Sequence, residues 1–162
     1  MPEKKTYHVL VVEDNKLTTL LLQKFLEAGG HTVSTAYDGV QAMEHLELLD
    51  DDNLPDCITT SIMMSPKDGF ETCKEIKSTE RLMHIPIIVV SSQLVDPDNQ
   101  IKALSCGAND FLCKPVERTI LLKKVEIFGE LNQLRKENSD MLQKLKNLRQ
   151  CVWMPVAGKA FA

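Results

Sequence analysis

Five short, largely apolar runs alternate with helical patterns over residues 1–126, and this alternation restricts the fold more than any other feature of the sequence. The first and fourth runs lack the apolar–polar alternation of a half-exposed strand, which is typical of strands buried on both faces of a parallel sheet. The predicted strands are residues 7–12, 32–36, 57–61, 85–90 and 110–113. Five strand-then-helix units predict an α/β fold, an open, doubly wound parallel sheet of five strands.

Polar side chains stand where four of these strands end. The acidic pair Glu13 and Asp14 follows the first strand, and Ser61 ends the third. Ser91 follows the fourth strand, and Lys114 follows the fifth. Ligands of open α/β sheets bind beyond the carboxyl ends of the strands. We therefore expect these side chains to converge on one functional site.

Four stretches at these strand ends carry a resemblance to a known family. They are VLVVEDN at 9–15, IMM at 62–64 with Asp68-Gly69 behind it, PIIVVSS at 86–92, and ALSCGANDFLCKP at 103–115. In order and spacing they resemble the receiver domain of two-component response regulators, over residues 7 to about 126. The resemblance implies a flavodoxin-like fold that takes a phosphoryl group from a histidine kinase onto an aspartate, with Mg²⁺, and then changes shape.

The same resemblance assigns expected roles to single residues. Glu13 and Asp14 would be the acids that hold the cation, and the backbone carbonyl of Met63 would complete its shell. The remaining expected site residues contact the phosphoryl group or move with it. They are Lys114 as the ion-pairing cation, Ser91 as the switch hydroxyl, Phe111 as the aromatic that moves with it, and Pro115, expected to follow a cis peptide bond that holds Lys114 inward.

The sequence departs from the family at Ser61, which occupies the position of the phosphorylated aspartate. A serine hydroxyl of ordinary pKa is a weak nucleophile and needs an adjacent base. The histidines, His8, His31, His45 and His84, all fall away from the carboxyl ends of the predicted strands. We therefore expect a receiver that is not phosphorylated at the usual position. Ser61 can be the natural residue of a pseudo-receiver or an engineered block on phosphorylation, and the sequence leaves both open.

Replacement of the aspartate also weakens the expected cation site. Glu13 and Asp14 repel each other and need a counter-charge, which Lys114 can supply from within the protein. We therefore predict no bound cofactor, with Mg²⁺ binding weakly if at all.

Beyond residue 126 the last helix continues with a heptad pattern. Apolar residues recur at alternating spacings of four and three, with Asn138 at an a position, which favours a parallel, in-register coiled-coil dimer. The predicted dimer seam is Ile127, Leu131, Leu134, Asn138, Met141, Leu145 and Leu148. The alternative is an amphipathic helix that folds against its own domain or against a missing one.

Three segments follow from these patterns. Residues 1–126 form the expected receiver domain, and residues 127–150 form the coiled-coil extension of its last helix. Residues 151–162 are expected to be a tail or a linker to an output module that lies outside this sequence, with the helix ending at Pro155. A receiver with a helical stalk resembles the front of regulators that carry an output such as a cyclic-dinucleotide synthase.

Composition narrows the function classes. A net charge of −4, with the basic residues scattered through the helices, argues against a nucleic-acid partner. No apolar run is long enough for a membrane span, and five widely spaced cysteines without a C-x-x-C pair favour a reducing, cytoplasmic compartment. A flavin carrier on this fold is disfavoured because Glu13 and Asp14 would repel the flavin phosphate. We expect a signalling module rather than an enzyme, with a second copy of the chain, a histidine kinase or an output domain as partners.

Overall fold

The computed structural model describes the backbone of residues 3–160 and the side chains of residues 3–151. The five strands are β1 (His8–Val12), β2 (Thr32–Ala36), β3 (Cys57–Thr60), β4 (Ile87–Ser91) and β5 (Asp110–Cys113). The α-helices are α1 (Lys16–Ala28), α2 (Gly39–Leu48), α3 (Gly69–Ser78), α4 (Pro97–Ser105) and α5 (Arg118–Ala160), and the short 3-10 helices are η1 (Asp51–Asn53) and η2 (Ser92–Val95). Helices and strands alternate as the sequence predicts.

The strands form one parallel sheet in the order β2-β1-β3-β4-β5. This topology confirms the predicted doubly wound α/β fold. Strand bounds differ by one or two residues from the predictions, for local reasons. Pro86 has no N–H to donate to a ladder, so β4 begins at Ile87, and the N–H of Tyr7 donates to the His31 ring instead of to a strand.

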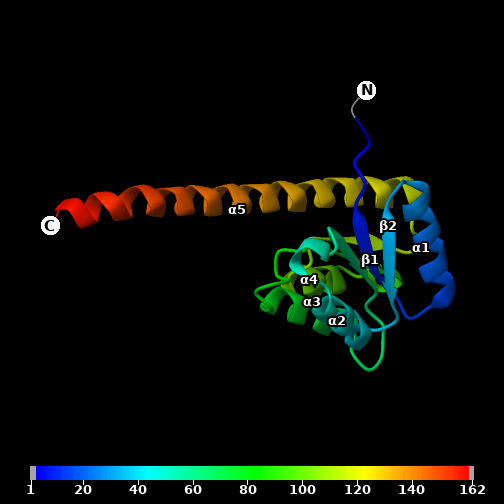
Figure 1. Ribbon diagram of the computed structural model, residues 1–162. Coiled ribbons are helices and arrows are strands. Elements are labelled where there is room, and N and C mark those ends of the chain that lie inside the picture. Colours follow the sequence, from blue (N-terminus) through cyan, green and yellow to red (C-terminus); the bar gives the residue numbers. More distant parts are fainter. Residues whose placement is uncertain (1–2, 161–162) are drawn as a thin grey trace.

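Helices cover both faces of the sheet (Figure 1). On one face α1 and α5 place Leu22, Leu26, Leu121 and Val125 against side chains of β1, β3, β4 and β5. On the other face α2, α3 and α4 pack over a second core that includes Leu10, Ile58 and Ile87. Because helices cover both faces of the sheet, a functional site is expected at one of the two edges where the strands begin or end.

The N-termini of the helices are capped by the side chains that precede them. Asn15 accepts hydrogen bonds from Leu17 N and Thr18 N, and Asp38 accepts one from Gln41 N. Asp68 and Glu71 form a reciprocal capping box at the N-terminus of α3. These caps fix where each strand-to-helix turn ends, and so hold the turns that carry the site.

Helix α5 first packs on the sheet and then projects past the domain (Figure 1). The helical backbone continues to Ala160, so the predicted end at Pro155 is wrong. A proline at 155 has no N–H to donate to the backbone carbonyl of Cys151, four residues earlier. Cys151 is exposed, so water can hydrogen-bond to that carbonyl instead. The side chains of 152–160 and the last two residues of the predicted tail lie outside the described part of the chain. None of the described helices is long and apolar enough to cross a membrane.

Candidate functional site

The carboxyl ends of β1, β3, β4 and β5 bring the predicted site residues to one edge of the sheet. These four strands are consecutive neighbours, so Glu13, Ser61, Ser91 and Lys114 stand at adjacent strand ends. The N–H of Glu13 continues the pairing by donating to Ala36 O at 3.0 Å, and that of Ser61 donates to Val12 O at 2.9 Å. The backbone at the site is therefore an extension of the sheet itself.

Glu13 and Lys114 form the central ion pair of this edge. Lys114 Nζ lies 2.9 Å from Glu13 Oε2, and the other carboxylate oxygen accepts from Asn15 N at 3.2 Å. Glu13 is only 2% exposed. Burial raises the pKa of its carboxyl, against the opposite effects of Lys114 and of the Asn15 N–H. The pair satisfies Glu13 internally, as its charge requires.

Asp14, by contrast, points to solvent. It lines a cleft of about 560 Å³ with Met63, Asp68 and Lys102, among others. The side chain of Met63 is 63% exposed, whereas that of Met64 is buried in the core. The two acids of the predicted pair thus have different environments, one buried and paired and one open to the cleft.

Ser61 lies at the end of the central strand and is 5% exposed. The turn that follows packs closely on it, because a Cβ added at Gly69 would lie 1.8 Å from the Ser61 carbonyl oxygen. The four histidines lie elsewhere, with His8 bonded to Ser34 and His31 bonded to the Tyr7 backbone. In the described part of the chain, Ser61 therefore has no histidine placed to serve as its base.

The other residues that were predicted to contact the phosphoryl group or to move with it have structural roles in this conformation. The Ser91 hydroxyl accepts from Gln93 N at 3.2 Å and caps η2. Phe111 is partly buried against the core under α2, α3 and α4. The Lys114–Pro115 peptide bond is cis, as the resemblance implies.

The donor set at this edge does not fit a tightly bound Mg²⁺. The described side chains contain no group of three or more His, Cys, Asp or Glu residues that could hold a metal ion. One of the two acids is already neutralised by Lys114 at 2.9 Å, which leaves Asp14 as the free carboxylate. Mg²⁺ usually requires carboxylate oxygens together with phosphate oxygens. The predicted weak cation site stays a prediction.

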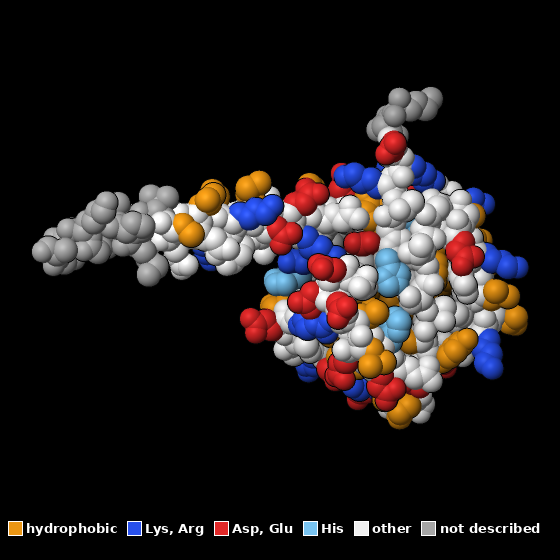
Figure 2. All heavy atoms as spheres, viewed as in Figure 1, with side chains coloured by type: hydrophobic (Ala, Val, Ile, Leu, Met, Phe, Trp, Pro, Cys, Tyr) orange, Lys and Arg blue, Asp and Glu red, His pale blue; other side chains and the backbone are white. Residues whose placement is uncertain are grey.

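The predicted dimer seam lies on the exposed side of α5. Its apolar side chains from Ile127 to Leu148 are between 45% and 63% exposed, and hydrophobic side chains are visible along the projecting helix in Figure 2. The opposite side of the helix packs on the domain, with Val125 buried and Asn132 2% exposed. At about 100° per residue, Ile127 and Leu134 lie roughly 200° from these two residues. The seam therefore faces solvent along the described part of the helix.

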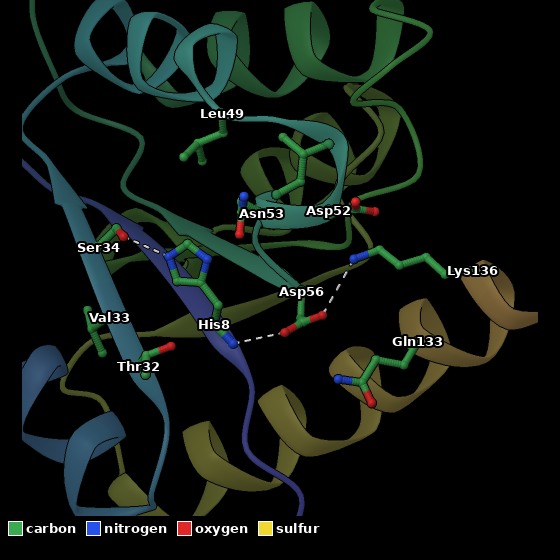
Figure 3. Close-up of a pocket in the computed structure, with 11 residues that line it drawn as sticks. His8, Thr32, Val33, Ser34, Leu49, Asp52, Asn53, Asp56, Gln133 and Lys136 are labelled. Carbon is green, nitrogen blue, oxygen red and sulfur yellow. Dashed lines mark hydrogen bonds and ion pairs between the residues drawn. The ribbon is translucent and has the colours of Figure 1, made fainter.

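A second cleft, of about 720 Å³, lies at the edge where the strands begin, away from the predicted site (Figure 3). It is formed by β1, β2, the segment before β3, and α5. His8 Nε2 and Ser34 Oγ are 2.6 Å apart, and Asp56 accepts from His8 N at 2.9 Å while its other oxygen lies 3.7 Å from Lys136 Nζ. Sequence reasoning missed this cluster, although the alternation of side chains along the first two strands could have placed His8 and Ser34 on the same face of the sheet.

Comparison with known proteins identifies the chain's relatives. Residues 9–126 match the response regulator receiver domain family. The chain is 35% identical over 117 residues to the response regulator PleD of Caulobacter vibrioides, which covers 72% of this chain and 25% of PleD. It is 33% identical over 117 residues to the response regulator MprA of Mycobacterium ulcerans, covering 72% of this chain and 47% of MprA. The chain thus spans half or less of the length of these relatives.

Solved structures show the same fold. The signal receiver domain of a histidine kinase from Syntrophus aciditrophicus superposes with a TM-score of 0.69 at 30% identity, covering 76% of this chain and 90% of that one. A receiver domain of a sensor histidine kinase from Pseudomonas aeruginosa, which has a magnesium ion in its active-site cleft, gives a TM-score of 0.69 at 26% identity. That match covers 78% of this chain and 99% of the other.

Proposed function

Because the chain belongs to the response regulator receiver domain family of two-component signalling, we propose that it is a receiver that does not switch by phosphorylation at the usual position. Ser61 occupies the phosphoacceptor position in this proposal. The observation that carries it is the buried Ser61 at the end of the central strand β3, whose neighbours β1 and β4 end beside Glu13 and at Ser91. An aspartate there would be an anionic nucleophile, whereas the serine hydroxyl needs a base, and none of the described histidines lies at this edge.

The Glu13–Lys114 pair supports a fixed rather than a switching state. Lys114 is the predicted partner of a phosphoryl group, yet it lies 2.9 Å from a carboxylate that is buried. Breaking such a pair leaves an uncompensated buried charge, at a cost of about 3–5 kcal/mol. We infer that Lys114 stays with Glu13 and that the domain works through protein contacts on its α4–α5 side and through the projecting helix.

Dimerisation is the second part of the proposal. The seam on α5 is exposed, apolar and in heptad register, which supports a parallel coiled coil with a second copy of the chain. The curated relatives are longer than this chain. An output domain behind the stalk, and a histidine kinase as an upstream partner, are proposed on that basis.

The phosphoacceptor proposal is tested with acetyl phosphate and excess Mg²⁺, followed by intact mass. The chain itself, Ser61→Asp and the uncharged control Ser61→Asn are compared. We expect no phosphorylation of the chain or of Ser61→Asn. Phosphorylation of Ser61→Asp would favour the second candidate, a working aspartate switch that is silenced by the serine.

The outcomes separate the candidates. Phosphorylation of the unaltered chain would contradict the proposal, since it would require another acceptor residue. If Ser61→Asp also stays unmodified, the pocket has lost the reaction at more than one position, and the module acts through binding alone.

A further inference from the structure

The described residues contain a serine with the base that Ser61 lacks, at the opposite edge of the sheet. Ser34 Oγ lies 2.6 Å from His8 Nε2, within the range expected for a nucleophile and its general base. His8 and Ser34 come from the neighbouring strands β1 and β2, which pair in a register that sets His8 beside Thr32. Ser34 lies two residues further along β2 than Thr32, so its side chain points to the same face of the sheet. The sheet therefore holds the His8 and Ser34 side chains close together on one face.

The contact and the burial of His8 suit the role of a base. In the tautomer that carries its proton on Nδ1, Nε2 accepts from the Ser34 hydroxyl at 2.6 Å. Burial lowers the pKa of His8, against the effect of Asp56, and keeps the ring neutral at pH 7.

The pair opens onto the cleft of about 720 Å³ (Figure 3). The wall of the cleft includes the apolar residues Leu49 and Leu54 and the cation Lys136 on α5. Asp56 takes no part in orienting the ring, because its carboxylate accepts from the backbone N–H of His8 and pairs with Lys136. The cleft thus brings an apolar wall together with the His8–Ser34 pair.

From this arrangement we propose that Ser34 is an activated nucleophile that accepts the acyl group of a small ester bound in the cleft, with His8 as its base. Ser34 Oγ forms a bond to the acyl carbon, and its proton passes to His8 Nε2. The ester C–O bond then breaks, and His8 gives the proton to the departing alcohol. The acyl chain lies against Leu49 and Leu54, which line the cleft. The site goes beyond the signalling function proposed above and is independent of Ser61.

The proposal is tested on the full chain with p-nitrophenyl acetate, by mapping acetylated residues as a function of time. We expect Ser34 to be acetylated at least about 100-fold faster than Ser105 and Ser139, two exposed serines that serve as internal references. His8→Gln should slow the reaction at Ser34 by about 100-fold or more, and Ser34→Ala should abolish that adduct. Ser61→Ala is the matched control and should leave the reaction at Ser34 unchanged.

A pH profile of the unaltered chain gives a readout that does not depend on a variant's folding. The rate at Ser34 should rise with pH through a pKa below the ordinary histidine value of 6.5 and then level off. A rate at Ser34 no greater than at Ser105 and Ser139, or one that rises with hydroxide concentration without levelling, would overturn the proposal and leave the His8–Ser34 bond as a cross-strand structural contact.

Discussion

At the scale of single residues, the two edges of the sheet differ in what each polar side chain can do. Lys114 at one edge is paired with a buried carboxylate, and His8 at the other faces a serine hydroxyl. The strand-end rule located Glu13, Ser61, Ser91 and Lys114 from the sequence alone. It could not show that Lys114 bonds Glu13 rather than Asp14, or that the Ser91 hydroxyl caps η2, because those choices depend on side-chain distances.

The histidines also make stability depend on pH. His31 is buried, stacks on Tyr7, and accepts the Tyr7 N–H at Nδ1, 3.1 Å away. Burial lowers the pKa of His31, as it does for His8 and His84. Because the folded state disfavours the protonated ring, the unfolded state binds more protons once the pH falls below about 6.5. The raised pKa of Glu13 has the opposite effect on stability. Its contribution to the free energy of unfolding is fully present below pH 4.5 and is lost as the pH rises through the pKa of the folded state.

We therefore expect the free energy of unfolding to fall as pH drops from 7.5 to 5.5. The loss begins near 6.5 and is complete below the lowered pKa values of the folded state. Urea unfolding at several pH values measures it. His31→Gln, which keeps a polar group at the same place, should flatten the pH dependence by removing one titrating group. An equal slope in the variant and the unaltered chain would show that His31 is not responsible.

At the scale of elements, helix α5 combines a side that packs on the domain with a side that faces solvent. It carries Val125 and Asn132 on the side that faces the sheet and the heptad residues on the other side. Heptad spacing predicted the exposed side. Packing of this helix on its own domain was predicted only as an alternative, because Asn132 and Gly129 are not apolar. In the structure Asn132 donates to the Asp56 carbonyl at 3.2 Å, and Gly129 packs on the Tyr7 ring. The boundary at residue 126 stays a prediction, with domain contacts continuing beyond it.

Asn132→Ala should destabilise the protein by about 1–3 kcal/mol, because the carbonyl of Asp56 loses its donor in a buried place. The free energy of urea unfolding measures this cost. Asn147→Ala on the exposed part of the same helix is the matched control and should change the free energy by less than about 0.5 kcal/mol. Equal effects of the two substitutions would mean that the contact with Asp56 contributes nothing.

At the scale of the whole molecule, the alternation of strands and helices was sufficient to predict the sheet and its two helical layers. It could not predict how far α5 extends beyond the domain. The helix continues past Pro155 only if water hydrogen-bonds to the backbone carbonyl of Cys151, an exposed residue. Nor could it locate the cleft at the beginning of the strands, which residues far apart in the sequence form together.

The assembly is tested by sedimentation of the chain at high concentration. We expect a dimer, and Leu134→Glu combined with Leu145→Glu should give monomers, because each places charge at the seam. Gln143→Glu combined with Asn147→Glu adds the same charge to the outer side of the helix and should leave the dimer intact. A monomeric unaltered chain would contradict the proposed coiled coil.

The anchoring of α5 gives the molecule the geometry of a lever. Asn132 and Lys136 fasten the helix at the start of β3, and the helix continues from there to Ala160. At about 1.5 Å per residue, the part beyond residue 136 is about 36 Å long. A tilt of about 10° at the anchor would therefore carry the far end through about 6 Å. A small movement at the beginning of the strands would therefore produce a large displacement of a domain attached to the far end of α5. This displacement would need no phosphorylation at the opposite edge of the sheet.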